Sequence, residues 1–271
     1  MTTYFRSLAS EFAKVFRTRL WWLLAIILVG YVGTAAGGIA LAFAFAPDAV
    51  STPGAALPVG DALAPLVYSM ASATGFVFPV ILGAISVTSE VRHRTLTTTF
   101  TAIPRRGVVL AGKATVALVM GAMLGVLGFA ASVGLGALAL GLGDIDTRLG
   151  DSDIWAMVAR GILAMALWGF VGVGLGVTVP SQIGSIVAIL AFTQFIEPLV
   201  RLAGGLIEPL GEVVKFLPGA AGDALVGASF YTLMGGAGIE LEWWQGALLL
   251  TGYGLLFLLI GRATFWRRDV T

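Results

Sequence analysis

Long apolar intervals without charged residues recur along the chain. They run over residues 20–47, 62–89, 114–143, 161–196 and 243–261. A helix that crosses the hydrocarbon core of a bilayer needs about 20 mostly apolar residues, so each interval can hold a span. Acidic loops flank both ends of the fourth interval, and Pro180-Ser181-Gln182 interrupts it. This interval therefore predicts two spans joined by a turn, with a re-entrant loop at 180–184 as the alternative.

The pattern thus predicts an all-α membrane protein with six transmembrane helices in a single domain over residues 1–271. The expected spans are about 20–45, 62–88, 114–141, 154–178, 183–202 and 243–261. A polar segment over 89–113 and a long region over 203–242 join them.

The first 19 residues predict an amphipathic helix that lies in the membrane interface. Its apolar positions recur at helical spacing: Tyr4, Phe5, Leu8, Phe12, Val15 and Phe16. The polar positions between them are expected to face water: Arg6, Ser7, Ser10, Glu11, Lys14 and Arg17. A plain cytoplasmic tail is the alternative. A signal peptide is rejected, because the following apolar run is about twice the usual length of a signal-peptide core.

Composition agrees with a lipid environment. Of 271 residues, 58% are hydrophobic and 11% are charged, and the mean hydropathy is +0.96. A water-soluble domain carries about 25% charged residues, so most soluble folds are excluded. The chain has no cysteine and one histidine, which argues against thiol chemistry and against zinc or haem sites built on Cys and His.

The placement of charge predicts the orientation. Loops on the cytoplasmic side of a membrane are enriched in Lys and Arg. With both termini cytoplasmic, 12 of the 16 basic residues fall inside and 12 of the 15 acidic residues fall outside. The region over 203–242 is then extracellular, and the segment over 89–113 is cytoplasmic.

Candidate catalytic chemistry is sparse. Residues 107–113 match the glycine and lysine positions of a phosphate-binding loop, but Ala114 replaces the hydroxyl residue that would hold magnesium. We therefore expect a membrane-entry loop in which Lys113 reaches to the interface. The inside residues Glu11, Glu90, His93 and Asp269 are not expected to cluster, which argues against a membrane-embedded enzyme. No catalytic residue and no metal site is predicted.

Two groups of residues could meet a substrate. Aromatic and polar side chains of spans two and five are candidates for a pathway, with a lipid-facing role as the alternative: Tyr68, Phe76, Phe78, Phe192, Gln194, Phe195 and Glu197. Glu197 and Arg201 stand four residues apart and predict an ion pair at the outer end of span five. An interfacial pair without further role, an outer gate and a site for a cationic substrate stay open.

Glycines recur on the faces of spans one, three and four and predict close helix packing. They are Gly30, Gly33, Gly37, Gly121, Gly125, Gly128, Gly169, Gly172 and Gly176.

The cytoplasmic segment contains a short apolar stripe. Leu96, Phe100 and Ile103 recur at helical spacing before Pro104, as in a helix that docks into the groove of a partner. A solvated connector is the alternative.

Glu90-x-Arg92-His93-Arg94-Thr95-Leu96, followed by Pro104-x-Arg106 and Lys113, resembles the cytoplasmic signature of ABC-2 type permeases, the membrane subunits of ATP-binding-cassette exporters. The likeness extends to the amphipathic start, the six spans, Leu217-Pro218-Gly219 and the ending Arg267-Arg268-Asp269-Val270. Arg94 stands where many members of that family have glycine.

The resemblance implies a permease in the bacterial inner membrane that moves an amphipathic or hydrophobic substrate, such as a drug or a lipid, outward. It implies a homodimer or a pair with a related permease, and two copies of a separate ATPase that binds ATP and Mg. No cofactor and no nucleic acid is expected on this chain. The residues that the resemblance assigns to ATPase coupling are Glu90, Arg92, Arg94, Thr95, Leu96, Phe100, Pro104 and Arg106.

The stretch 204–238 is expected to be non-helical over much of its length, and it resembles the outer re-entrant helices of this family. Leu96 and Phe100 are expected to anchor the ATPase, with Glu90, Arg92 and Arg94 setting its orientation. A stand-alone secondary transporter or channel is the competing function, but it would need coupling charges near the middle of the bilayer or inverted repeats.

Overall fold

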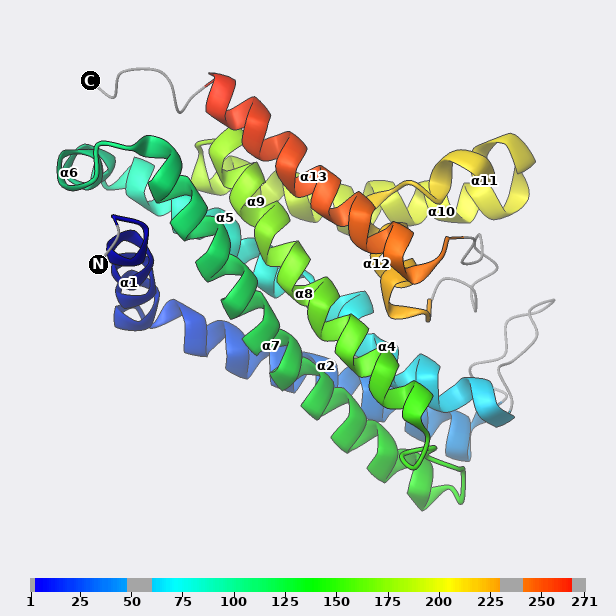
Figure 1. Ribbon diagram of the computed structural model, residues 1–271. Coiled ribbons are helices and arrows are strands. Elements are labelled where there is room, and N and C mark those ends of the chain that lie inside the picture. Colours follow the sequence, from blue (N-terminus) through cyan, green and yellow to red (C-terminus); the bar gives the residue numbers. More distant parts are fainter. Residues whose placement is uncertain (1–2, 48–59, 230–240, 265–271) are drawn as a thin grey trace.

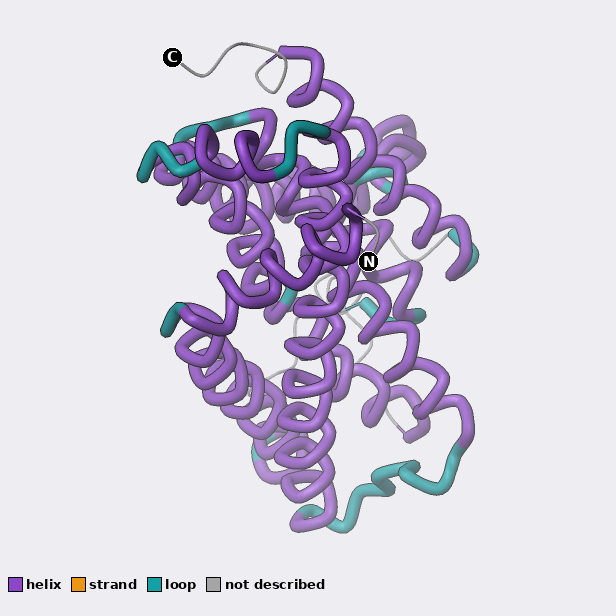
Figure 2. The backbone as a smooth tube through the Cα atoms, turned by 60° about the vertical axis from the view of Figure 1, so that its left-hand side comes forward, coloured by secondary structure: helices purple, strands orange, loops and turns teal. Residues whose placement is uncertain are grey.

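The computed structural model describes residues 3–47, 60–229 and 241–264. Within these ranges the chain forms helices joined by turns and contains no strand (Figure 2). In chain order the helices are α1 (Thr3–Arg17), α2 (Leu20–Phe45), η1 (Gly60–Ala62), α4 (Leu63–Gly75), α5 (Val77–Arg92), α6 (Leu96–Ala102), α7 (Arg106–Leu142), α8 (Ser152–Thr178), α9 (Gln182–Ala191), the π-helix η2 (Phe192–Ile196), α10 (Glu197–Leu206), α11 (Glu208–Val214), α12 (Pro218–Val226) and α13 (Trp243–Thr264).

Six helical stretches are long and apolar enough to cross a membrane, as the sequence predicts. They are Leu20–Phe45, Gly60–Arg92, Arg106–Leu142, Ser152–Thr178, Gln182–Leu206 and Trp243–Thr264. Helix α8 lies among α5, α7 and α13 and makes its most extensive contacts with these three helices (Figure 1). The turn at Val179–Ser181 separates α8 from α9, and the Ser181 hydroxyl caps α9 by accepting the Gly184 amide.

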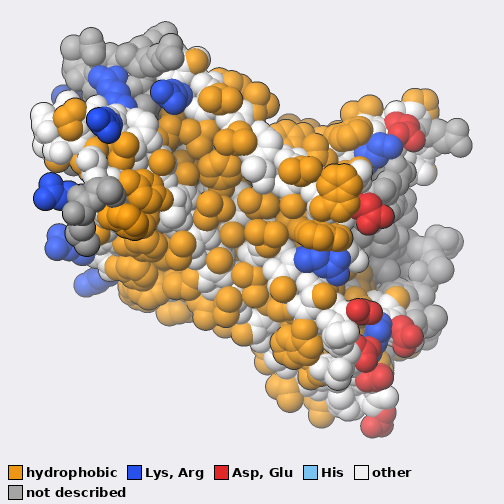
Figure 3. All heavy atoms as spheres, in the orientation of Figure 1, with side chains coloured by type: hydrophobic (Ala, Val, Ile, Leu, Met, Phe, Trp, Pro, Cys, Tyr) orange, Lys and Arg blue, Asp and Glu red, His pale blue; other side chains and the backbone are white. Residues whose placement is uncertain are grey.

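Charge separates along the long axis of the bundle. Figure 3 shows Lys and Arg at the end that holds α1 and α6, Asp and Glu together with a few Lys and Arg at the opposite end, and a broad apolar surface between them. We call these the basic end and the acidic end. Large apolar side chains such as Ile26, Val187 and Leu259 are more than half exposed on the intervening surface, as lipid contact requires.

The second span is broken rather than continuous. Helix α4 ends at Gly75 and α5 begins at Val77, with Phe76 between them. Pro79 explains the break, because proline has no amide hydrogen to donate to the carbonyl four residues earlier. The break places Phe76 among the residues of an internal cavity described below.

The third span begins earlier than predicted. Helix α7 starts at Arg106, so residues 106–113 form its first two turns and are not part of a connecting segment. The stretch that matches a phosphate-binding loop is therefore helical. Lys113 does not reach to the interface as expected, because its side chain is fully buried.

The corner between α5 and α6 contains a strained residue. Arg94 has a φ of 54°, in the left-handed region that glycine favours. Its amide donates to Val91 O and the Thr95 amide donates to Glu90 O, which is the hydrogen-bond pattern of a Schellman motif. Arg94 thus occupies the position after the helix cap where glycine is most common.

The region between spans five and six is more helical than expected. Within the stretch 204–238, helices α11 and α12 form over Glu208–Val214 and Pro218–Val226, and α10 ends at Leu206. A proline stands in the first turn of α11 and of α12, where its missing amide costs no helical hydrogen bond, whereas Pro198 lies within the continuous stretch Gln182–Leu206, directly after the π-helix η2. Residues 230–240 lie outside the described part.

Glycines bring the backbones of the central helices together. A Cβ atom on Gly172 of α8 would overlap the Val80 carbonyl oxygen of α5, and one on Gly169 would lie 2.6 Å from Ala117 O of α7. Gly121 and Gly176 are equally constrained by neighbouring backbone, so the packing role predicted for them is confirmed. Gly30 does not share this role, because nothing lies within 4 Å of the added atom, and a Cβ on Gly37 or Gly128 would make only ordinary contacts, at 3.6 Å and 3.7 Å.

We predict that Gly172→Ala destabilises the protein by about 1–3 kcal/mol, because α5 and α8 must separate to admit the methyl group. Gly30→Ala is the matched control. It adds the same methyl group to a helix where there is room, and alanine is the better helix former. Thermal unfolding of the purified proteins in one detergent measures both, and equal midpoints for the two variants would contradict the packing described here.

Candidate functional site

Two groups of charged residues are buried in the bundle, one near each end. The first, which we call the basic-end cluster, consists of Glu11, Lys14, Glu90 and Lys113. The residues come from α1, α5 and α7, which are distant in sequence. Paired burial is the usual condition for charged side chains in an apolar interior.

Lys113 is the centre of the basic-end cluster. Its Nζ donates to Glu11 Oε2 at 2.7 Å, to Glu90 Oε1 at 2.8 Å and to the Ser86 carbonyl oxygen at 2.9 Å. These contacts use all three hydrogens of the ammonium group. Lys113 thereby ties α7 to both α1 and α5.

Lys14 closes the cluster from the more exposed side. Its Nζ lies 2.5 Å from Glu11 Oε1 and 2.7 Å from Glu90 Oε1. Partial burial lowers the pKa of Lys14, but the hydrogen bonds and charges of Glu11 and Glu90 outweigh it and raise the pKa above 10.5. Lys14 therefore remains cationic at neutral pH.

Two expectations about this end are wrong. Glu11 and Glu90 do cluster, contrary to the prediction, and Glu90 is buried and paired within the chain, so it is not available to orient an ATPase. Two polar positions of α1 also do not face water as expected, although Leu8, Phe12 and Val15 of its apolar side pack against the core. Ser7 and Glu11 are buried against α7, whereas Phe5 is 54% exposed. The buried ammonium of Lys113 explains this orientation, because it attracts the carboxylate of Glu11.

The apolar stripe of α6 packs against its own bundle. Leu96 is fully buried with Val87 of α5, Val109 of α7 and Val173 of α8. Phe100 and Ile103 are partly buried against the same cluster. The guanidinium of Arg106 lies 5.0 Å from the centre of the Phe100 ring. Leu96 therefore cannot anchor a partner, and Phe100 contributes to the fold.

The other side of α6 is exposed and polar. Its exposed residues, together with those of the flanking corners, are Arg92, His93, Arg94, Thr95, Thr97, Thr98, Thr101, Pro104 and Arg105. We call this surface the α6 face. It contains four of the eight residues assigned to ATPase coupling from the sequence, and Arg92 Nη1 also reaches Gln182 Oε1 of α9 at 3.3 Å.

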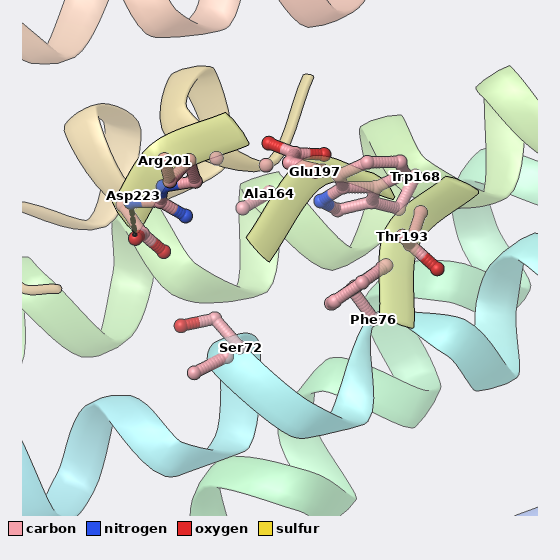
Figure 4. Close-up of a pocket in the computed structure, with 11 residues that line it drawn as sticks. Ser72, Phe76, Ala164, Trp168, Thr193, Glu197, Arg201 and Asp223 are labelled. Atoms are coloured by element: carbon pink, nitrogen blue, oxygen red, sulfur yellow. Dashed lines mark hydrogen bonds and ion pairs between the residues drawn. The ribbon is translucent and has the colours of Figure 1, made fainter. Parts of the chain in front are cut away.

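The second buried group surrounds a small cavity towards the acidic end (Figure 4). Its lining comes from α4, α8, η2, α10 and α12: Ser72, Ala73, Phe76, Ala164, Trp168, Thr193, Glu197, Arg201, Gly219, Gly222 and Asp223. The volume open to the centre of a water molecule is about 20 Å³, enough for about one water. The π-helix η2 directly precedes Glu197, and such turns are frequent at functional sites.

The charged residues of this cavity join α10 to α12. Arg201 Nη2 donates to Asp223 Oδ2 at 2.6 Å and to the Ser229 hydroxyl at 3.1 Å. Glu197 Oε1 accepts the Ala220 amide at 3.0 Å, in the first turn of α12. Arg201 thus forms a close ion pair with Asp223, which the sequence did not predict. The Arg201–Asp223 pair is buried and does not lie at the interface.

The structure brings together only part of the predicted pathway. Phe76 and Glu197 line the cavity, and the Phe76 ring lies 4.6 Å from that of Trp168. Tyr68 is buried elsewhere, where its hydroxyl donates to Thr147 O. The other predicted members lie outside the cavity lining: Phe78 beside Tyr31, Phe192 partly buried, and Gln194 and Phe195 exposed.

Sequence reasoning missed Asp223, Ser72 and Thr193 at this cavity and Lys113 at the other end. Asp223 carried a signal that could have found it, because an acidic residue within an apolar stretch needs a cationic partner. Lys113 carried a comparable signal, because a lysine beside a long apolar run needs an anionic partner if it is buried. Across the described ranges no three His, Cys, Asp or Glu residues are arranged to hold a metal ion.

Comparison of the chain with protein-family models gives no match, and comparison with the curated proteins gives none either.

We predict that Lys113→Met destabilises the protein by about 3–5 kcal/mol, because it leaves two buried carboxylates without their central cation. Lys14→Met is the matched control, since it removes a cation from the same carboxylates at a half-exposed position and should cost about 1 kcal/mol or less. Thermal unfolding midpoints measure the difference. Equal losses for the two variants would show that burial of Lys113 has no energetic consequence.

A second prediction concerns the cavity. Arg201→Met should release α12 from α10, because Glu197 and Asp223 would then face each other without a cation. Hydrogen exchange of the 218–226 amides should accelerate at least tenfold. Lys215→Met, which removes a partly exposed ion pair with Glu212, should leave these amides unchanged. Unaltered protection in Arg201→Met would refute the role assigned to the ion pair.

Proposed function

We propose that this chain is the membrane permease subunit of an ATP-binding-cassette exporter, driven by a separate ATPase that docks on the α6 face. Six long apolar helices make the chain an integral membrane protein of the multi-pass type, and export of an amphipathic or hydrophobic substrate is the function that this architecture supports best. The proposal includes pairing with a second permease and cytoplasmic placement of the basic end.

The observation that carries the proposal is the attachment of α6. This short helix lies outside the spans, yet Leu96 is buried in one apolar cluster with residues of α5, α7 and α8. Its opposite side is exposed and carries arginines and threonines. A partner that pushes on the exposed side of α6 would therefore act on α5, α7 and α8 through the apolar cluster around Leu96.

Two further observations support the proposal. The basic-end cluster fastens α1 to α5 and α7, so both helices outside the spans at this end move with the spans. The left-handed backbone at Arg94 is the conformation that glycine would adopt, and glycine is common at this position in the family that the sequence resembles.

The basic end also fits the expected orientation. Arg92, Arg94, Arg105 and Arg262 are exposed there, and exposed arginines are typical of cytoplasmic surfaces of membrane proteins. An acidic patch on the ATPase would complement this surface and favour rapid association.

Charge reversal on the α6 face tests the proposal. The tagged full chain is purified from membranes of its source organism, and ATP hydrolysis by co-purified protein is measured. We expect the parent to retain an ATPase and Arg94→Glu with Arg105→Glu to lower the retained activity at least tenfold, which corresponds to about 1.4 kcal/mol of binding. Neither side chain has a packing role in the bundle, so folding should be preserved.

Arg262→Glu on α13 is the matched control, because it makes the same charge change at the same end but away from α6. Its retained activity should equal that of the parent. Absence of any ATPase from the parent preparation would contradict the proposal. Substrate flux through the purified chain in vesicles, driven by an ion gradient without ATP, would instead favour a secondary transporter.

A further inference from the structure

The two buried groups of charged residues differ in their charge balance. The basic-end cluster has two carboxylates and two ammonium groups. The cavity towards the acidic end has two carboxylates, those of Glu197 and Asp223, but one guanidinium, that of Arg201. Each of these three residues is at most 6% exposed. With both carboxylates ionised, the cavity would contain one uncompensated negative charge away from water, which is unfavourable.

Asp223 holds the guanidinium of Arg201. Arg201 Nη2 lies 2.6 Å from Asp223 Oδ2, and the Ser229 hydroxyl donates to the same oxygen at 2.5 Å. The hydrogen bond to Glu197 comes instead from the backbone amide of Ala220, at 3.0 Å. The charge of Arg201 and this amide both favour an ionised Glu197, but one guanidinium balances only one of two carboxylates. The excess negative charge therefore falls on Glu197.

Among the described residues, the cavity lining contains no cation other than Arg201. Arg160 of α8 is partly exposed and donates to a carbonyl of its own helix, and the Tyr253 hydroxyl of α13 donates to a backbone carbonyl. The stretch 202–242 contains one basic residue, Lys215, which forms its own ion pair. The surroundings of Glu197 therefore favour the uptake of a positive charge.

The size and the lining of the cavity select a proton as this charge. The volume of about 20 Å³ holds about one water, which excludes an organic cation. The indole N–H of Trp168 belongs to the lining, and a Cβ atom on Gly222, another lining residue, would lie 3.2 Å from its nitrogen (Figure 4). Trp168 is 4% exposed, and no described residue accepts from this N–H group. A metal ion binds oxygen lone pairs and is disfavoured beside such a donor.

A single water would complete the hydrogen bonds of the cavity. Its oxygen accepts from Trp168, and its hydrogens are donated to Glu197 and to the hydroxyl of Ser72 or Thr193. These two hydroxyls already donate to backbone carbonyls three or four residues earlier, so their oxygens act as acceptors. A water in this position connects Glu197 to the other polar groups of the lining and can pass a proton to its carboxylate.

We propose that the cavity towards the acidic end is a proton-binding site, in which Glu197 is the proton acceptor beside one bound water. The proton adds to a carboxylate oxygen and comes from a hydronium ion of the surrounding solution, so no other bond forms or breaks. The protonated cavity is neutral, because the Arg201–Asp223 pair balances itself. The inference does not depend on export or on the presence of an ATPase.

Infrared spectroscopy tests the proposal. The full chain is purified in dodecyl maltoside, which has no ester carbonyl. At about pH 6, exposed Asp and Glu side chains with pKa values of about 4 are ionised, so the C=O stretch of a protonated carboxyl group reports a buried proton. We expect this band in the parent and a shift of the band when glutamate side chains are labelled with carbon-13 at the carboxyl carbon.

Variants locate the proton. Glu197→Gln should lower the intensity of the band at least tenfold. Glu212→Gln is the matched control, because it makes the same substitution at an exposed side chain paired with Lys215, and it should keep the band.

The pH dependence of thermal stability gives a second readout. Between about pH 6 and pH 9 the parent should lose stability as the pH rises, because the folded chain must then bury an ionised Glu197. Glu197→Gln imitates the protonated acid, so it should lose less stability over the same range. Glu212→Gln should follow the parent.

Three results would overturn the proposal. Absence of the band from the parent at about pH 6 would show that the buried carboxylates are ionised. A band that carbon-13 in glutamate does not move would assign the proton to an aspartate. An undiminished band in a folded Glu197→Gln protein would place the proton on another glutamate. The labelled parent alone decides the first two results, so the test does not require the variant to fold.

Discussion

Close contact between helix backbones around α8 is the constraint on which the rest of the structure depends. Lipid tails are as apolar as leucine side chains, so helices in a bilayer associate through close packing rather than through the hydrophobic effect. Gly172 lets α8 meet α5, Gly169 lets it meet α7, and Gly174 lets it meet α13, where a Cβ would lie 2.8 Å from Gly254 O. These three contacts fix the relative positions of four spans.

Both charged sites are built on that frame. Lys113 on α7 and Glu90 on α5 meet because their helices are held at fixed separations from α8, and α1 then joins through Glu11. At the other end, Trp168 of α8 forms one wall of the cavity that contains Arg201 and Asp223. A change in helix separation would therefore alter two ionic sites as well as the apolar contacts.

The spans were predictable because their signal is local. A run of about 20 apolar residues and the distribution of Lys and Arg depend on no other part of the chain. The basic-end cluster was not predictable in the same way, because Glu11 and Lys113 are 102 positions apart and meet only through the register of packed helices. The α1 helix shows the consequence. Its apolar pattern predicted an amphipathic helix, and Leu8, Phe12 and Val15 do pack against the core, but the pattern did not indicate that pairing with a buried lysine would bury Ser7 and Glu11 as well. The break at Pro79 lay within reach of the sequence, since proline removes a helical hydrogen bond wherever it stands.

The neutrality of the basic-end cluster has an electrical consequence. Moving one elementary charge through a membrane potential of 100 mV changes its energy by about 2.3 kcal/mol. Glu11, Lys14, Glu90 and Lys113 carry no net charge together, so α1, α5 and α7 could shift as a unit along the membrane normal while this group transferred no gating charge. Any coupling of such a motion to the voltage across the membrane would then have to come from the arginines at the same end, such as Arg17, Arg92 and Arg106, and not from the buried cluster.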